Sequence, residues 1–233
     1  MPKWSAFSKV SSGTTRNHSQ MRRWDYQSFM MYDDKDELAF RAILAANLAV
    51  FMNWQLGFPL SRENLVKYFT ASTAGVYGQK NVLSLVGASF SHFDLGHLFV
   101  NMLTFYFFGK NVFLSMGRQF AVPMYLIAGA AGSYAQVREG WVNRYNSSVI
   151  GASGAVSSFV IFSILQNPRA TVLIYFVVPI PAALFGLLYV LQDVYAMRQR
   201  NPNGSGISIG HSAHLAGSLV GGLAYLGRRW RFF

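Results

Sequence analysis

The chain has 233 residues, of which 52% are hydrophobic and only 12% are charged. Soluble domains carry roughly 25% charged residues, so this composition argues against a water-soluble globule. The sequence holds no cysteine, which excludes a thiol nucleophile, a disulfide framework and a cysteine-ligated metal site. The net charge of +11 is compatible with nucleic acid. Because lysine and arginine gather mostly in loops and tails, we favour contact with anionic lipid head groups and expect no nucleic-acid partner.

The N-terminal segment is basic. Its first 24 residues contain five basic residues, no acid and many serines and threonines. This composition is typical of an organellar targeting segment, and a plain basic tail is the alternative that the sequence leaves open. An acidic group within residues 33–37 marks the edge of the water-exposed tail. We therefore expect a basic tail over residues 1–37, a membrane domain over residues 38–227 and a basic C-terminal tail over residues 228–233.

Long uncharged stretches separate the charged residues beyond the tail. A spanning helix needs about 20 mostly apolar residues, and six stretches approach this length. They cover residues 38–57, 95–114, 119–136, 147–166, 170–192 and 211–227, of which the first contains Arg41 and the second Lys110. The sequence therefore predicts an all-α, polytopic membrane protein with six transmembrane helices. The connection over residues 58–94 is too long for a turn and too polar to span, so we expect it to fold on the membrane surface.

Ionisable residues are costly inside a membrane and are therefore functional candidates. All nine acidic residues lie outside the six predicted spans or at their ends, and Asp193 follows directly after the fifth. This distribution excludes a paired-aspartate intramembrane site and a buried carboxylate proton relay. The sequence also lacks the H-E-x-x-H pattern of a zincin-type metal site. The polar residues that remain inside the spans are histidine, asparagine and serine.

Three of the predicted spans carry polar residues that suit one reaction. His97 and Asn101 lie four residues apart in the second span, so they share one helical face. Ser153 lies in the fourth span and His214 at the start of the sixth. Alone, the first pair fits interhelical hydrogen bonding, and the serine fits a seam of small residues. Together they supply a nucleophile, a base and a separate pair of donors, which are the roles that acyl transfer requires.

Glycines accompany both the serine and the histidine. Gly151 and Gly154 flank the serine, and Gly217 and Gly221 follow the histidine at a spacing of four. Such spacing lets another helix approach closely, so we expect these four glycines to pack helices around the site. His211, which opens the sixth span, is interpreted as an interfacial histidine without a catalytic role.

The chemistry of the pair follows from the side chains. A serine hydroxyl is a poor nucleophile until a base takes its proton, and a neutral imidazole does so near pH 7. Since no acid lies inside the predicted spans, no carboxylate is available from them to orient His214. We therefore expect a Ser153–His214 dyad in which packing or an uncharged partner orients the imidazole. Donors at the developing oxyanion are worth about 3–4 kcal/mol each, and no metal or cofactor is predicted.

At these motifs the sequence resembles the rhomboid intramembrane serine proteases. The resemblance is carried by residues 91–101, 151–154 and 213–217 and by Gly221, in the order and on the spans of the family's six-helix core. It implies a rhomboid-like bundle with Ser153 as the nucleophile and His214 as the general base. It also implies that His97 and Asn101, with the backbone N–H of the serine, bind the oxyanion.

The resemblance extends to activity and compartment. It implies an endopeptidase that cleaves the transmembrane segments of single-pass membrane proteins, with membrane lipid as its other partner. Residues 67–70, 91–93 and 211–214 are similar to the mitochondrial, presenilin-associated branch of the family. With the basic tail, they favour the mitochondrial inner membrane, and other membranes stay open. Ser157 stands where the best-known bacterial pattern has an aromatic residue that stacks on the catalytic histidine.

Two other classes of protein remain as alternatives. An inactive rhomboid-like protein would bind or escort membrane clients, but such relatives usually lack the serine or the histidine, and both are present. A small transporter or channel would need polar or charged residues along a continuous path, and the acid-free spans speak against it.

Overall fold

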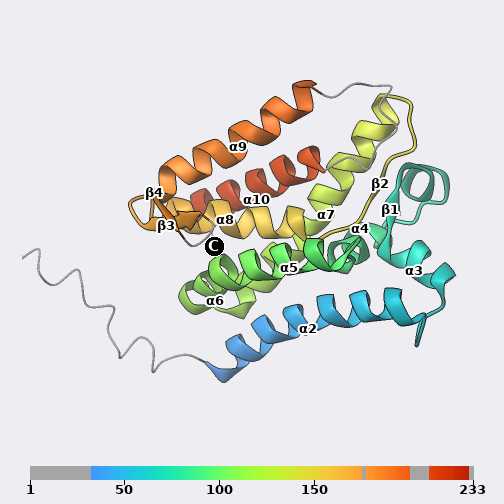
Figure 1. Ribbon diagram of the computed structural model, residues 1–233, viewed down its shortest axis with the longest axis horizontal. Helices are drawn as coiled ribbons and strands as arrows, with labels where there is room; N and C mark the ends of the chain where they lie inside the picture. The colour runs from blue at the N-terminus through green and yellow to red at the C-terminus, as the bar shows by residue number, and fades with distance from the viewer. Residues whose placement is uncertain (1–32, 175–176, 200–209, 231–233) are drawn as a thin grey trace, which may run out of the picture. The chain divides into compact units, whose positions relative to one another are not determined.

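Figure 1 shows the chain as a computed structural model, which describes residues 33–174, 177–199 and 210–230. The basic segment over residues 1–24 lies outside the described residues. Helices dominate, as the all-α prediction requires, although two small antiparallel sheets were not predicted. In chain order the elements are α2 (Asp34–Leu56), α3 (Arg62–Phe69), β1 (Ala71–Ser72), η2 (Ala74–Gly78), α4 (Leu83–Gly87), η3 (Ala88–Phe90), α5 (Leu95–Thr104), η4 (Phe105–Gly109), α6 (Lys110–Met116), α7 (Arg118–Val142), β2 (Ser148–Val149), α8 (Ser153–Gln166), β3 (Thr171–Ile174), β4 (Val178–Pro181), α9 (Ala182–Gln199) and α10 (His211–Arg229).

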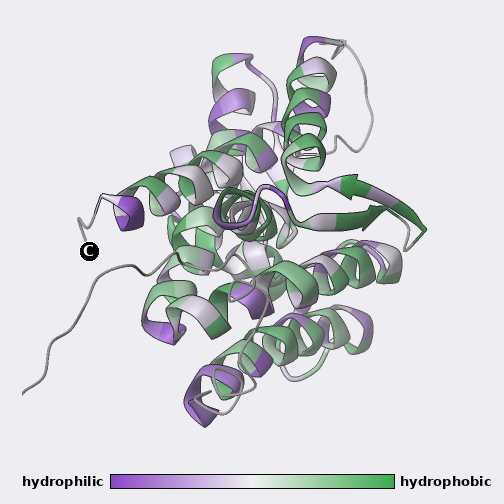
Figure 2. Cartoon of the chain, turned by 90° about the vertical axis from the view of Figure 1, so that its left-hand side faces the viewer, coloured by the Kyte–Doolittle hydropathy of each residue, from purple (hydrophilic) through white to green (hydrophobic). Residues whose placement is uncertain are grey.

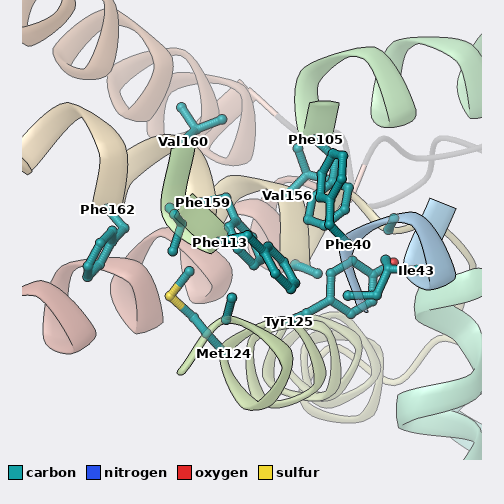
Figure 3. Close-up of a cluster of buried hydrophobic side chains, with 14 of the residues drawn as sticks. Phe40, Ile43, Phe105, Phe113, Met124, Tyr125, Val156, Phe159, Val160 and Phe162 are labelled. Carbon is teal, nitrogen blue, oxygen red and sulfur yellow. The ribbon is translucent and has the colours of Figure 1, made fainter. Parts of the chain in front are cut away.

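The core is a cluster of aromatic and aliphatic side chains, which Figure 3 shows at close range. Phe105, Phe113, Tyr125 and Phe159 are fully buried. The rings of Phe105 and Phe159 meet edge to face with their centroids 5.1 Å apart, and Phe40 stacks on Phe105 at 5.2 Å. Such aromatic pairs contribute about 0.5–1.5 kcal/mol beyond their burial. The cluster therefore holds α2, the α5–α6 stretch, α7 and α8 together.

Large apolar side chains cover the outward faces of several helices. Leu187 and Leu191 on α9, Leu48 on α2, and Leu219 and Leu223 on α10 are all exposed. Figure 2 shows apolar residues along the sides of the helices. An extensive exposed apolar surface marks contact with a partner or a membrane, and hydrocarbon is the environment in which a leucine-covered helix face is stable. The exposed faces therefore agree with a protein embedded in a bilayer.

By length and apolar composition, only one helical stretch among the described residues, Leu95–Met116, passes as a membrane span. The six predicted spans are therefore not confirmed individually. α8 has only 14 residues, and α10 devotes several positions to glycine, which contributes little hydropathy. α2 carries charged residues in its first turns.

The fifth predicted span is wrong in its boundaries. It was expected over residues 170–192, but the first part of this stretch forms the β3–β4 hairpin, and α9 begins only at Ala182. Pro179 and Pro181 explain the difference, because proline lacks the N–H group that a helix interior needs. Asp193 was expected just after the span, but it lies inside α9.

The connection over residues 58–94 forms α3, β1, η2, α4 and η3. Its position on the membrane surface stays a prediction. Its strand β1 pairs with β2, so that Ala71 lies opposite Val149. The fourth span, expected over residues 147–166, therefore begins with a strand, and its helix α8 starts at Ser153.

The first turns of α2 and α7 lie together. Asp33 caps α2 by accepting a hydrogen bond from the backbone N–H of Lys35 at 2.9 Å. The Arg118 guanidinium, from the start of α7, donates to Asp33 at 2.7 Å and to Asp36 at 3.0 Å. Both helices therefore begin at the same end of the bundle, as a chain that crosses a bilayer in alternating directions requires for its first and third spans.

Candidate active site

Ser153 is the first residue of α8 and not an interior helical residue. Two residues earlier, Gly151 has a φ of 135°, a conformation that residues with a side chain rarely adopt. The N–H of Gly151 donates to the carbonyl of Ala88 at 2.9 Å. This turn places the serine at a helix N-terminus, where N–H groups lack intrahelical partners and the helix dipole favours negative charge. The backbone N–H of Ser153 is therefore in a suitable environment to stabilise an anion.

The connection over residues 58–94 holds the turn that precedes Ser153. The N–H of Thr73 donates to the carbonyl of Ser147 at 2.9 Å, and the N–H of Ser147 donates to the Thr73 hydroxyl at 3.1 Å. With the β1–β2 pairing and the bond from Gly151 to Ala88, these contacts fix the chain on both sides of the turn. Sequence analysis did not predict this clamp, because it depends on pairing between segments more than 70 residues apart.

His97 faces the same turn from α5. A Cβ atom built on Gly151 would lie 3.0 Å from Nε2 of His97 and 3.8 Å from Oγ of Ser153. The missing side chain of this glycine therefore leaves a small space that the two functional groups share. The N–H of Phe93 donates to Nδ1 of His97 at 3.4 Å, so a neutral ring carries its proton on Nε2. His97 thus presents a hydrogen-bond donor beside the serine.

Asn101 lies one turn along α5 and is buried. Its side-chain amide donates to the carbonyl of His97 at 2.9 Å. An amide nitrogen carries two hydrogens, so this bond does not exhaust its donor capacity. The structure thus brings His97 to the serine and links Asn101 to His97 through the helix backbone.

His92 supports His97, a role that sequence analysis did not assign. Its ring is buried and lies edge-on to the ring of His97, with the centroids 5.1 Å apart. Burial, and secondarily the neighbouring His97, lowers the pKa of His92 to about 3. His92 therefore stays neutral at physiological pH, and its ring packs against His97 without adding a charge beside it.

His214 lies in the first turn of α10, which packs backbone to backbone on α8. A Cβ atom on Gly217 would lie 1.9 Å from the carbonyl oxygen of Gly154, and one on Gly221 would lie 2.2 Å from another carbonyl oxygen of α8. Only glycine permits this approach, as the small-residue spacing indicated. Gly154 is next to Ser153 in the chain, so the serine and His214 come from helices in direct contact.

The imidazole of His214 has a carboxylate partner, so the expectation that none was available was wrong. Asp193 on α9 is 4% exposed. Its Oδ1 lies 3.1 Å from Nδ1 of His214 and 2.7 Å from Nδ1 of His211. An ionised carboxylate only accepts hydrogen bonds, so each ring presents Nδ1–H to it. Nε2 of His214 then keeps its lone pair, which is the form of the ring that acts as a base.

Tyr189 lies one turn before Asp193 on α9 and stacks on His214. The ring centroids are 6.4 Å apart with 21° between the planes. The Tyr189 hydroxyl lies 2.6 Å from that of Ser157, and Ser157 donates to the carbonyl of Ser153 at 2.7 Å. A different helix therefore supplies the aromatic ring that the bacterial pattern carries at the position of Ser157. The sequence held no local signal for this exchange.

His211 was interpreted as an interfacial residue without a catalytic role. The structure instead places its ring against Asp193, and the ring meets that of His214 edge-on at 6.1 Å. Asp193, His211 and His214 thus form one hydrogen-bonded cluster. The signal that sequence analysis missed was the pair of prolines at 179 and 181, which moves the start of α9 and brings the carboxylate inside the helix.

Comparison with known families shows the class of protein to which this helical fold belongs. Residues 79–230 match the Rhomboid domain, and the chain belongs to the rhomboid family. It is 30% identical over 197 residues to RHOMBOID-like protein 12, mitochondrial, of Arabidopsis thaliana, covering 78% of this chain and 56% of the relative.

Two further relatives are similar at the same level. The Presenilin-associated rhomboid-like protein, mitochondrial, of Mus musculus is 30% identical over 186 residues, covering 77% of this chain and 45% of the relative. Rhomboid protein 1, mitochondrial, of Saccharomyces cerevisiae is 30% identical over 189 residues, covering 77% and 50%. The chain thus spans about half the length of the relatives it matches. The resemblance is confirmed, and these relatives support a multi-pass protein of the mitochondrial inner membrane.

Proposed function

We propose that this chain is an intramembrane serine endopeptidase that cleaves the transmembrane segments of single-pass membrane proteins. Its membrane domain covers residues 38–227. The six spans of this domain are α2, the α5–α6 stretch, α7, α8, α9 and α10. The observation that carries the proposal is the setting of His214, whose ring stacks on Tyr189 and hydrogen-bonds Asp193, and whose helix is in backbone contact with α8.

In the first step Nε2 of His214 takes the proton of the Ser153 hydroxyl as its oxygen attacks the peptide carbonyl. The carboxylate of Asp193 accepts the Nδ1–H of the same ring. This bond selects the tautomer with a free Nε2 lone pair and stabilises the imidazolium that forms. Asp193 and Tyr189 touch the base and not the substrate, so they are positioning residues.

The attack places a negative charge on the former carbonyl oxygen. Three donors are proposed to bind this oxygen: the backbone N–H of Ser153 at the start of α8, Nε2–H of His97 beside the same turn, and the amide of Asn101, which is bonded to the carbonyl of His97. Each such donor is worth about 3–4 kcal/mol in the transition state. The imidazolium of His214 then gives its proton to the departing amine. In the second half of the reaction His214 takes a proton from a water molecule as the water attacks the acyl group, and the imidazolium returns a proton to the departing Oγ of Ser153.

A fluorophosphonate probe and a fluorogenic transmembrane substrate test the proposal on the full chain in detergent. We expect the probe to label Ser153, and Ser153→Ala and His214→Ala each to abolish both labelling and cleavage. Ser163→Ala, on the same helix, is the matched control and should leave both intact. Cleavage by the Ser153→Ala protein would overturn the proposal. A folded wild-type protein that neither reacts with the probe nor cleaves would indicate an inactive, client-binding rhomboid-like protein.

A further inference from the structure

Three side chains beside the proposed base are arranged as metal ligands. One ligand atom from each of Asp193, His211 and His214 lies within 4.8 Å of the other two. The histidines are three residues apart at the start of α10, so they share a helical face, and the carboxylate reaches them from α9. Both rings turn Nδ1 toward the same carboxylate oxygen, at 2.7 Å and 3.1 Å.

This donor set suits a divalent transition-metal ion. Two imidazole nitrogens and one carboxylate oxygen bind Zn²⁺ in sites that keep a fourth position for water. Zinc bonds of about 2.0–2.2 Å place tetrahedral ligands roughly 3.3 Å apart, so the two distances from Nδ1 to the Asp193 oxygen, 2.7 Å and 3.1 Å, need to lengthen only slightly. The imidazoles are 17% and 18% exposed and the carboxylate only 5%. The two rings are therefore partly open to their surroundings, while the buried carboxylate is held between them.

We propose that Asp193, His211 and His214 bind Zn²⁺ and that this binding inactivates the protease. The regulatory half of the proposal rests on the proposed function, because it acts through the base of Ser153. The metal-binding half rests only on the geometry of the cluster.

Inactivation follows from the tautomers of the imidazole ring. Zinc coordinates a nitrogen through its lone pair, so Nδ1 of His214 must lose its proton to the other nitrogen of the same ring. The proton moves from Nδ1 to Nε2 in both histidines, and none has to leave the protein. Nε2–H has no lone pair to accept the proton of the Ser153 hydroxyl. Without metal, the Asp193 carboxylate thus favours the active tautomer of His214. With metal, the same carboxylate is the third ligand of the inhibitory site.

Metal binding is tested without any catalytic readout. The full-length Ser153→Ala protein, washed with a chelator in detergent, is titrated with Co²⁺, whose visible absorption reports tetrahedral coordination. We expect Co²⁺ to produce an absorption band that disappears when Zn²⁺ replaces it. On the same background, His211→Ala should lower the apparent affinity for Co²⁺ roughly 10- to 100-fold. His18→Ala, which removes a histidine of the N-terminal segment, is the matched control and should leave the titration unchanged.

Inhibition is tested on the wild-type chain. We expect Zn²⁺ to abolish cleavage reversibly, with activity restored by a chelator. Each variant is compared with its own metal-free rate, and His211→Gln should raise the inhibitory Zn²⁺ concentration at least about tenfold.

The outcomes separate the two halves of the proposal. A protein that binds neither Co²⁺ nor Zn²⁺, or an apparent affinity that His211→Ala leaves unchanged, overturns the metal site. Binding without inhibition overturns the regulatory role. If the metal binds through His211 but the wild-type chain never cleaves a substrate, the proposed function and its regulation fall while the metal site stands.

Discussion

Oδ1 of Asp193 lies 3.1 Å from Nδ1 of His214. These two residues come from different helices, and their contact gives the proposed base a charged partner within a largely apolar bundle. The geometry corresponds to the acid–imidazole half of a serine-protease triad, in which the carboxylate sets the tautomer of the ring. We therefore propose that Ser153, His214 and Asp193 act together, in place of the dyad that the sequence predicted.

Replacing Asp193 by asparagine should slow catalysis without preventing substrate binding. An amide can donate to Nδ1, which selects the wrong tautomer, so we expect kcat to fall roughly 10²–10⁴-fold with little change in KM. The pH–rate profile should also change shape, because the variant removes the charge that stabilises the imidazolium. Asp193→Glu should recover part of the rate, and Asp34→Asn is the control at an exposed acid. All assays contain a chelator. A kcat within twofold of wild type would contradict the positioning role.

The contact between Tyr189 and Ser157 should be visible as an energetic coupling. Tyr189→Leu removes the stacked ring and should lower kcat roughly 2- to 10-fold, since aromatic stacking is worth about 0.5–1.5 kcal/mol. Tyr189→Phe keeps the ring but loses the bond to Ser157, worth about 1 kcal/mol. We therefore expect the Tyr189→Phe and Ser157→Ala double variant to raise the activation free energy, measured from kcat, by less than the sum of the two single variants. Strict additivity of the two would count against the contact.

The close approach of α8 and α10 predicts opposite effects at two glycines of one helix. Gly217→Ala would place a methyl group 1.9 Å from the carbonyl oxygen of Gly154, which forces backbone to move and should cost about 1–3 kcal/mol of stability. A Cβ atom on Gly222 has no neighbour within 4 Å, so Gly222→Ala should stabilise the helix by up to about 1 kcal/mol. Thermal unfolding in detergent compares the two, and equal midpoints would contradict this packing.

The ion pair between Asp33 and Arg118 predicts a pH dependence of stability. The backbone N–H of Lys35 and, after it, the Arg118 guanidinium hold the pKa of Asp33 below its ordinary value of 3.8. A lowered folded-state pKa contributes stability above the unfolded value, and this contribution is lost as the pH falls through the folded value. Asn caps helices as well as Asp does, so Asp33→Asn isolates the charge.

We expect the Asp33→Asn protein to unfold at a lower temperature than wild type at pH 7, with the gap closing as the pH falls below 3.8. The exposed position of Asp33 makes the effect small. If the difference in unfolding temperature were the same at pH 7 and below pH 3.8, the charge of Asp33 would not be its cause.

Local patterns in the sequence were enough to predict the motifs of the site. The four-residue spacing of His97 and Asn101, and of Gly217 and Gly221, determines which helix face they share, and no tertiary information is needed for this. The glycine seam was likewise predictable, because only glycine lets two helix backbones touch. The serine was assigned to a span interior, whereas the turn at Gly151 makes it the first residue of a helix.

The partners of His214 were not predictable in the same way. Run length alone placed Asp193 outside the membrane, although Pro179 and Pro181 carried the information that the helix starts later. Tyr189 carries no local signal at all, because its contact with His214 depends on how α9 packs against α10. The length of each uncharged stretch thus identified the apolar segments, but it did not show at which residue their helices begin.

The dependence of His214 on α9 has a pharmacological consequence. A small lipophilic compound that binds between α9 and α10 would separate the ring from both Tyr189 and Asp193 and so inactivate the proposed protease. Such a compound would need neither an electrophilic warhead nor any likeness to a peptide, and its target would be a seam between two helices.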